Sequence, residues 1–393
     1  MVSYYIEVIM AVSRRHFILA AGGAGLALIA TSSIFSVTRT PVKAISPWHE
    51  ISNLLECEDP RLSVFRHAIL APNPHNRQPW LIRLIGQNQA LLSCDLDRRL
   101  PITDPFDRQI LIGFGCFLEL ARIAAAELGI RMEITLFPEG EPGERLDKRP
   151  IASLQFVSEP SITKEPLYAF IGSRRSNKKP FDTSQPVESR FIEALGSHPS
   201  PSVKVAASNN GNLIENLRVL TWDAWKIELE TERAWLESVE LMRIGKTEIE
   251  SKPDGISIGG TVVEVLSMAG KITREEMAKK GSNSYNASID RYRPTMLSGM
   301  AYGWIVTDGN SRHDQIATGK AYVRMNLMAT CIGLGFHPVS QALQEYPEMT
   351  TMYDRVSTAL GARRDQRVQM LIRLGYGEVI DQAPRWPLAS RLI

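Results

Sequence analysis

The sequence has few of the residues from which metal sites and disulfide frameworks are built. Among its 393 residues there are four cysteines and seven histidines. The cysteines lie far apart without CxxC spacing, and the histidines form no HxH, HExxH or HxxxH pair. The sequence therefore predicts neither a disulfide framework nor a metal site. Cys116 and Cys331 lie in apolar, helix-like surroundings, where small buried thiols are common.

The chain also lacks a strong excess of charge of either sign. Its formal net charge is +2, with 44% hydrophobic and 22% charged residues, as in an ordinary globular protein. The first 44 residues hold four basic residues and one acidic residue, which leaves 41 basic against 42 acidic in the remainder. This balance argues against a nucleic-acid partner. The length exceeds that of a usual single core, so two domains or a duplicated one are expected.

The beginning of the chain has the features of an export signal. "SRRHFILAAGGAGLALIA" places Arg14 and Arg15 before an apolar run of 14 residues, Phe17 to Ala30. This run is short for a spanning helix and suits the core of a signal peptide. The motif resembles a twin-arginine signal, which implies a periplasmic location. Either the segment is cleaved or it stays as a membrane anchor, and the natural start is Met1 or Met10.

Two stretches of the chain show the same succession of features. "LELARIAAAELGIRMEITLF" (118–137) and "YVRMNLMATCIGLGFHPVSQAL" (322–343) each have an apolar helical face. The first ends at Gly129, and the second ends at Gly333 and Gly335, before strand-like residues. Two interpretations stay open, an internal duplication and a chance likeness between two amphipathic helices.

Side-chain amides and prolines are concentrated in "APNPHNRQPW" (71–80). The amides of Asn76 and Gln78 offer donors and acceptors that match the edge of a uracil-like ring. Pro74 and Pro79 stiffen the loop before a ligand arrives. Trp80 is expected in the core. The second half has no counterpart of this motif.

Basic residues are concentrated in "SRRSNKKPF" (173–181), around Ser176. Such a cluster suits a phosphate, although a solvated surface loop is the alternative. Arg373 interrupts the strand-like "VQMLIRLGYG" (368–377) and needs either an acidic partner or an anionic ligand. Because each half has a motif that the other lacks, the two would build one site between them. A phosphate clamp and amides for a heterocycle edge together suggest flavin mononucleotide (FMN).

These motifs, with "GLGFHP" and "MLIRLGYG", resemble the nitroreductase-like FMN proteins, and among them exported single-chain members that mimic the family's usual homodimer. The likeness runs from about residue 60 to residue 378. It implies an α+β fold of mostly antiparallel mixed sheets wrapped by helices, with two halves forming a pseudo-dimer. It also implies one FMN per chain, and a monomer or weak dimer in solution.

The resemblance implies a cofactor site made by both halves. Lys178 would lie nearest the flavin pyrimidine edge, and Arg373 would reach the phosphate. Asn73 departs from the usual serine, and Gln341 departs from the usual glycine at the turn near flavin N5. No catalytic side chain is expected, because the flavin carries the chemistry. The expected cofactor-binding residues are Arg174, Ser176, Lys178, Arg373, Pro72, Asn73, Pro74, Asn76, Gln78, Pro338, Val339, Ser340 and Gln341.

The expected domains are a signal or anchor at 1–44, one half at 45–165 and another at 166–393, with a helical insert at about 210–260. In the insert one helical face is apolar, and Pro253 and Gly255 break the helix. The resemblance makes the insert a lid over the flavin, and the alternative is a helical hairpin on one side of a sheet. The residues of the apolar face are Leu213, Leu217, Leu220, Ala224 and Ile227.

Three classes of function remain. The first is an FMN oxidoreductase that passes electrons from a donor, NAD(P)H if cytoplasmic, to a small nitroaromatic or quinone-like acceptor. The second is an FMN-sequestering protein with little or no turnover. The third is a membrane-attached interaction protein without a cofactor. Membrane association through the N-terminus fits all three.

Overall fold

The computed structural model describes residues 39–52, 59–196 and 202–393, so most of the predicted signal segment lies outside the described residues. Its first sheet is antiparallel with the strand order β1-β2-β4-β3. Burial alternates along β2, where Ala90, Leu92 and Cys94 are buried, as expected for a sheet with one face on the core. The strands are β1 (Trp80–Ile85), β2 (Gln89–Cys94), β3 (Ile130–Leu136) and β4 (Ala152–Ser158).

The second sheet repeats this order with strands from the other half of the chain. It is antiparallel in the order β5-β8-β10-β9. In each half a short helix precedes the first strand, and a long helix links the second strand to the third. The elements are α7 (Ser189–Gly196), β5 (Val203–Ser208), β8 (Ala301–Thr307), β9 (Gly335–Pro338) and β10 (Arg367–Gly375) in the second half, and α5 (Pro60–Ala68) leads the first.

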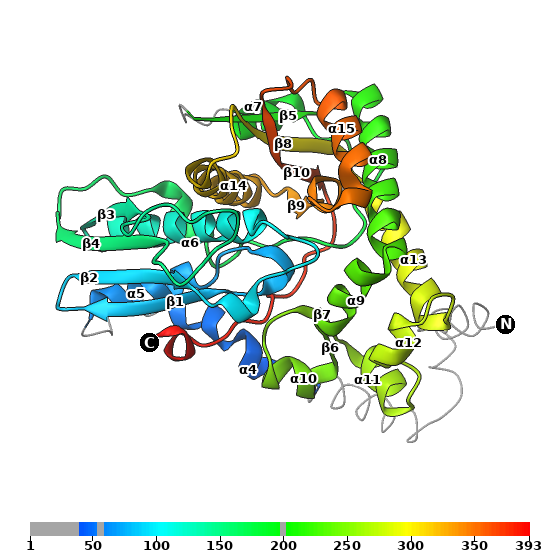
Figure 1. The fold of residues 1–393 in the computed structure, drawn as a ribbon, viewed down its shortest axis with the longest axis horizontal. Helices are drawn as coiled ribbons and strands as arrows, with labels where there is room; N and C mark the ends of the chain where they lie inside the picture. The colour runs from blue at the N-terminus through cyan, green and yellow to red at the C-terminus, as the bar shows by residue number, and fades with distance from the viewer. Residues whose placement is uncertain (1–38, 53–58, 197–201) are drawn as a thin grey trace, which may run out of the picture.

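The long helices α6 (Arg108–Glu127) and α14 (Arg312–Cys331) pack against each other between the two sheets (Figure 1). Each has 20 residues, and each carries a glycine at its eighth position, Gly115 and Gly319. A Cβ on Gly115 would lie 2.2 Å from the Ile316 carbonyl oxygen, and one on Gly319 would lie 2.0 Å from that of Ile112. The backbones therefore touch through equivalent residues, as in the self-complementary interface of a twofold dimer.

Both long helices end as the sequence predicts. Gly129 and Gly333 have φ of 70° and 75°, a left-handed conformation that favours glycine after a helix. Their beginnings differ, because Asp104 accepts from the backbone of Gln109 and Ile110 before α6, whereas a capping box of Ser311 and Asp314 starts α14. In the described part of the chain, α6 alone is long and apolar enough to cross a membrane, and it is a buried core helix.

A mostly helical insert separates β5 from β8 and runs along one side of the molecule (Figure 1). α8 packs on β8 and α15, with Leu217, Leu220 and Ala224 buried, so the predicted apolar face is confirmed. The helix ends at Glu230, because Thr231 is extended and begins α9. The insert and flanking helices are α8 (Gly211–Glu230), α9 (Glu232–Glu240), β6 (Met242–Ile244), α10 (Gly245–Ser251), β7 (Ile256–Ile258), α11 (Thr261–Met268), α12 (Arg274–Ala278), α13 (Asn283–Met296), α15 (Thr350–Ala359) and α4 (Val42–Ile45).

The α+β class with mostly antiparallel sheets is therefore confirmed; only β6 and β7 pair in parallel among the described strands. Trp80 is fully buried, with its ring centroid 5.2 Å from that of Phe117, which confirms its core role. Cys116 is buried in α6 as expected. Cys331 is exposed, because it is the last residue of α14 and its helical face there is no longer covered.

Candidate cofactor site

The decapeptide 71–80 has an unusual backbone. His75, Asn76 and Gln78 have φ of 44°, 52° and 50°, in the left-handed region that residues other than glycine rarely occupy. Such residues cost on the order of 1–3 kcal/mol each and persist only where the surroundings hold them, which is typical of binding sites. Pro74 starts a short 3-10 turn here, and Pro72 is buried beside it.

Contacts within the loop and with α6 hold this conformation. The Asn73 side chain accepts from the Gln78 backbone N–H at 2.7 Å and donates to the Ala71 carbonyl at 3.0 Å. Its Cβ lies 3.0 Å from where a Cβ on Gly113 would be, so the glycine lets the loop approach α6 closely. Asn73, at the position where the resemblance implies a serine, thus braces the loop.

The amides of Asn76 and Gln78 are used inside the protein. Gln78 is fully buried; its Nε2 donates to the Pro253 carbonyl at 2.7 Å, and its Oε1 accepts from the Trp386 backbone at 2.9 Å. Asn76 donates to Pro384 and accepts from Arg385. Both side chains therefore join the loop to the insert and to the C-terminal segment. The structure does not present Gln78 to a ring edge, since no polar atom of its amide is left for a ligand.

Arg174 of the basic motif belongs to a cluster of buried cations. Arg174 and Arg385 are 2% and 3% exposed, and both donate to the Leu70 carbonyl, at 2.9 Å and 3.1 Å. Together with Arg175 they surround the Trp48 ring, with guanidinium carbons 5.7, 5.3 and 5.0 Å from its centroid. We call these three arginines the Trp48 cluster.

The Trp48 cluster lacks a matching set of negative charges. Neither Arg174 nor Arg385 forms an ion pair with an acid of the described residues, and the Nε of each is buried without a hydrogen-bond partner there. Burial lowers the pKa of Arg174 to about 10, and burial together with Arg174 and Arg175 holds the pKa of Arg385 well below its usual value. Asp381 acts on Arg175 alone. Crowded cations with unused donors suit an anion.

Arg373 lies elsewhere and has a different environment. It is fully buried on β10, where it donates to His337 Nδ1 at 2.8 Å and to the carbonyls of Asn177 and Lys179. Phe181 covers its guanidinium, 4.1 Å from ring centroid to carbon. Arg373 therefore ties the basic motif to the second sheet, and no acid forms an ion pair with it among the described residues.

Ser176 and Lys178 follow Arg174 and Arg175 of the Trp48 cluster in the sequence. Ser176 hydrogen-bonds with Tyr322 of α14. Lys178 is exposed, yet desolvation by its surroundings and the charge of Arg291 lower its pKa, as expected of a side chain that reaches solvent from among crowded groups. Burial, Lys178 and Arg77 lower the pKa of His75 to about 4, so this imidazole is neutral at pH 7. Lys178 thus acts electrostatically on the decapeptide of the other half.

The turn after β9 holds the remaining predicted residues. Val339 is buried and donates to the Leu371 carbonyl at 2.9 Å, while Pro338 and Ser340 are half-buried. Gln341 hydrogen-bonds with the buried carboxyl of Glu228 on α8. Residue 341 is therefore tied to the insert by its side chain, which a glycine could not do.

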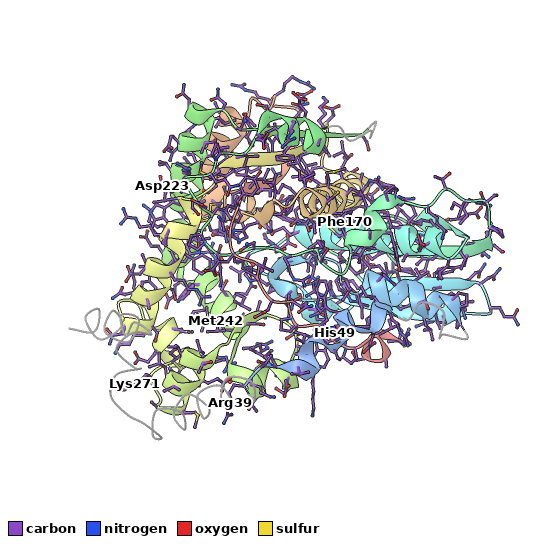
Figure 2. The ribbon with its side chains drawn as sticks, turned by 180° about the vertical axis from the view of Figure 1, so that it is seen from behind. Arg39, His49, Phe170, Asp223, Met242 and Lys271 are labelled. Carbon is purple, nitrogen blue, oxygen red and sulfur yellow. The ribbon has the colours of Figure 1, made fainter. Side chains whose placement is uncertain are left out.

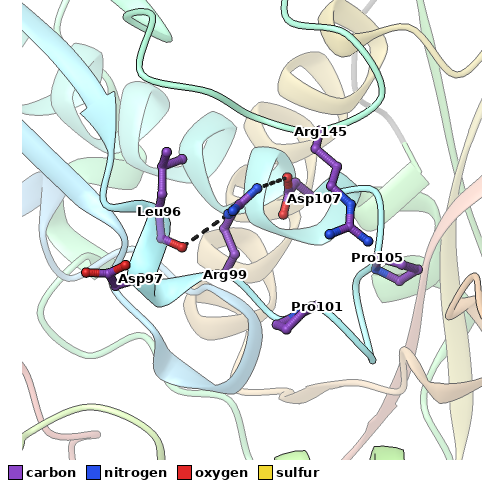
Figure 3. Close-up of a pocket in the computed structure, with 7 residues that line it drawn as sticks. All are labelled: Leu96, Asp97, Arg99, Pro101, Pro105, Asp107 and Arg145. Carbon is purple, nitrogen blue, oxygen red and sulfur yellow. Dashed lines mark hydrogen bonds and ion pairs between the residues drawn. The ribbon is translucent and has the colours of Figure 1, made fainter.

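A separate cavity of about 160 Å³ lies beside the start of α6 (Figure 3). In it Arg99 bonds to the Leu96 carbonyl and pairs with Asp107 at 3.5 Å, while Arg145 lies across from them. It contains none of the predicted residues, and its Arg99 and Asp107 pair with each other. The candidate site is therefore the region between the Trp48 cluster, Lys178 and the decapeptide.

The sequence did not single out three residues of this candidate site, namely Trp48, His75 and Arg385. Arg385 lies between Pro384 and Trp386 in "APRWP", where an arginine among rigid, apolar residues is a weak signal of burial. Trp48 lies outside every motif that the sequence singles out. Nothing in the sequence alone indicates that segments over 300 residues apart meet, as Arg385 and Asn76 do.

The chain was compared with family models and with known proteins. No family model matches the chain. A protein of Mycobacterium tuberculosis strain H37Rv named as an NAD(P)H nitroreductase is 30% identical over 119 residues, which are 30% of this chain and 33% of the relative. The acg protein of the same strain, also named as an NAD(P)H nitroreductase, is 29% identical over 133 residues, 34% and 38% of the two chains. The matches span about a third of these relatives, and they support the nitroreductase-like family.

Among solved structures, the chain is similar to FMN- and NADPH-dependent nitroreductase NfnB from Sphigopyxis sp. strain HMH. The identity is 13%, the match covers 57% of this chain and 97% of that chain, and the TM-score is 0.35. NfnB of Mycobacterium smegmatis, solved with NADPH, has 17% identity, coverage of 55% and 92%, and a TM-score of 0.33. A nitroreductase-like family protein from Bacillus cereus has 17% identity, coverage of 58% and 95%, and a TM-score of 0.30.

Proposed function

We propose that this chain binds one FMN between its halves and works as an oxidoreductase of the nitroreductase type. The observation that carries the proposal is the Trp48 cluster, in which Arg174 and Arg385 are buried with unused Nε donors and no acid paired to them among the described residues. A phosphate group supplies the missing charge and acceptors. The mycobacterial relatives are named as NAD(P)H nitroreductases, which supports the same class of reaction.

In this proposal Arg174, Ser176 and Arg385 hold the phosphate, and Lys178 lies toward the pyrimidine edge. Lys178 places positive charge where the reduced cofactor gains negative charge. The strained decapeptide, from the other half, forms the opposite wall. FMN supplies hydride transfer between a donor such as NAD(P)H and a small nitroaromatic or quinone-like acceptor. Arg373 acts as a brace of the motif rather than as a phosphate ligand.

We further propose that the two halves arose by internal duplication, with domains at 45–165 and 166–393 and export by the twin-arginine route. The matching strand orders and the equivalent glycine contacts of α6 and α14 support the duplication. Only one Trp48 cluster and one strained decapeptide occur among the described residues, which supports one FMN per chain.

A specific contact favours the second candidate, an FMN-sequestering protein. The insert is bonded to the decapeptide, because Gln78 donates to the Pro253 carbonyl and the Gly255 N–H donates to the Asn76 carbonyl at 3.3 Å. Buried Asp254 between them pairs with Arg98 at 2.6 Å and with Arg243 at 2.8 Å. A cover fastened in this way would exclude substrates and leave the cofactor bound.

The test is FMN titration of the purified protein, with Arg385→Met as the variant and Arg391→Met as its control. Arg391 is also buried near the C-terminus, but it faces Asp95 and Trp386 rather than Trp48. Loss of a charge-assisted bond predicts FMN affinity about tenfold lower or worse for Arg385→Met only. Equal FMN affinity in both variants would refute the phosphate assignment, and a native protein that does not bind FMN would refute the proposal.

Turnover separates the two candidates once FMN binding is established. Addition of NADPH and a nitroaromatic to the loaded protein is expected to bleach the flavin absorbance and consume the acceptor if the protein is an enzyme. A flavin that dithionite reduces, but NADPH does not, identifies the sequestering protein.

A further inference from the structure

Helix α11 of the insert has its polar and apolar sides reversed. Val262, Val265 and Met268 are 63%, 53% and 70% exposed, and Leu266 is 36% exposed. Glu264 of the same helix is only 6% exposed. A helix of a soluble protein normally turns its apolar stripe to the core. We call Val262, Val265, Leu266 and Met268 the α11 patch.

The reversed orientation is fixed by specific bonds of Glu264. Its carboxylate accepts from the backbone N–H of Lys246 at the start of α10 and lies 4.0 Å from the Arg39 guanidinium. A Cβ on Gly245 would lie 3.1 Å from Glu264 Oε1, so a glycine there makes room for the buried carboxylate. The α11 patch therefore faces outward because the opposite side of the helix is bound in place.

Exposed lysines follow the α11 patch in the sequence. Lys271 comes soon after the helix, and Lys279 and Lys280 come directly after α12; all three are exposed, whereas Glu275 is the one exposed acid among residues 261–280. Arg274 and Glu248 neutralise each other in an ion pair. Exposed apolar side chains beside lysines, which can extend their ammonium groups past an apolar surface, are typical of a surface that lies on anionic lipid.

The N-terminal segment leads to the same end of the molecule. Figure 2 shows Arg39, the first described residue, and Lys271 at one end. The Lys246 ammonium donates to the Thr40 carbonyl at 3.1 Å, which holds the entering chain against the insert. Residues 31–38 join it to the apolar run that ends at Ala30, and eight residues reach at most about 28 Å. An apolar run in a membrane would thus keep α11 close to the bilayer.

We propose that the α11 patch, with the exposed lysines that follow it, is seated in the interface of an anionic lipid bilayer beside the entry point of the N-terminal segment. The occupant is lipid rather than a second copy of the chain, because the patch consists of four side chains, exposed lysines outnumber exposed acids in residues 261–280, and the patch lies at the end of the molecule where the N-terminal segment enters. This contact orients the molecule on the membrane and does not depend on the proposed cofactor.

The test places an environment-sensitive fluorophore on the patch of the full chain. Met268→Cys is labelled with nitrobenzoxadiazole after Cys57 and Cys331 are replaced by serine, and Gln87→Cys, exposed in the turn between β1 and β2, is the control. With vesicles of phosphatidylcholine and phosphatidylglycerol, emission at position 268 should rise severalfold and be quenched by nitroxide-labelled lipid. Emission at position 87 should not change.

Two results would overturn the proposal. One is a probe at 268 that does not respond although the protein sediments with the vesicles, since the N-terminal segment would then make the only contact. The other is a probe already shielded without lipid, which would mean that the chain itself or a second copy covers the patch. As a second measurement, Val265→Asp should lower vesicle binding severalfold, whereas Val219→Asp, at a valine 50% exposed on α8, should leave it unchanged.

Discussion

The two halves have the same strand order and differ most in one connection. In the first half, residues 86–88 join β1 to β2 as a tight turn, whereas residues 209–300 lie between β5 and β8 in the second. A connection at the rim of a sheet can grow without changing the pairing of its strands. The framework that both halves share therefore brings α6 and α14 together. The insert, which belongs to the second half, adds further contacts to the first half.

Among the contacts between the insert and the first half, those of Asp254 are expected to contribute most to the free energy of unfolding. This buried residue of the insert pairs with Arg98 of the first half and Arg243 of the insert, and Arg77 lies 3.6 Å away. Asp254→Ala leaves the buried Arg77 and Arg243 without their ion-pair partner and removes one of the two acids that pair with half-buried Arg98, so we expect a loss of about 3–5 kcal/mol in the free energy of unfolding. Urea unfolding measures it, with Asp290→Ala, an exposed acid of α13, as the control. A loss no larger than in the control would mean that the insert is only loosely attached.

The helix contact tests how alike the halves are. Gly319→Ala forces a Cβ against the Ile112 carbonyl, and we expect a loss of about 1–3 kcal/mol from overpacking. Gly115→Ala should cost a similar amount, because the contact is reciprocal. Gly211→Ala, with no neighbouring atom within 4 Å of the added Cβ, is the control, measured by the same urea unfolding. Unequal losses at 115 and 319 would contradict a symmetric interface.

The smallest effect is expected from Glu228 of the insert. Burial raises the pKa of this carboxyl from 4.5 to about 7, against opposing bonds from Ser238, Gln341 and Gln344. The folded state therefore holds a proton that the unfolded chain releases, so stability falls as pH rises from about 4.5 to 7. Glu228→Gln should remove this fall and stabilise the protein by about 1–2 kcal/mol at pH 8.

The measurement for Glu228 is thermal or urea unfolding at pH 5 and at pH 8. The control is Glu230→Gln, at an exposed residue of the same helix. This substitution should change the free energy of unfolding by the same amount at pH 5 and at pH 8. An equal change of stability at both pH values in Glu228→Gln would show that the carboxyl is ionised throughout.

Local patterns were enough to predict the framework from the sequence. The apolar faces of α6 and α8, the left-handed glycines after α6 and α14, and buried Trp80 all follow from neighbouring residues. The site was less predictable, because its bonds join distant segments. The amide of Gln78 has the donors and acceptors to bind a ring edge, but it is hydrogen-bonded to the Pro253 carbonyl and the Trp386 backbone N–H.

The phosphate-side residues show the same limit. Arg373 and Arg385 are both buried arginines near the C-terminus, and only their three-dimensional neighbours separate a brace from a member of the Trp48 cluster. The predicted ligand roles of Arg174, Ser176 and Lys178, and those of the turn after β9, stay predictions until FMN binding is measured. The proposed roles depend on charge compensation across the fold, which a local sequence pattern does not reveal.

The C-terminal segment has a consequence for biosynthesis. Leu392 pairs with Ile82 at the outer strand of the first sheet, and the Ile393 N–H donates to the Ile82 carbonyl at 2.9 Å. Arg385 belongs to the same segment, so both that strand edge and the proposed phosphate site form only after residues 385–393 have been synthesised. The first half is synthesised early but is completed late, so the proposed cofactor could not be captured by the first half alone.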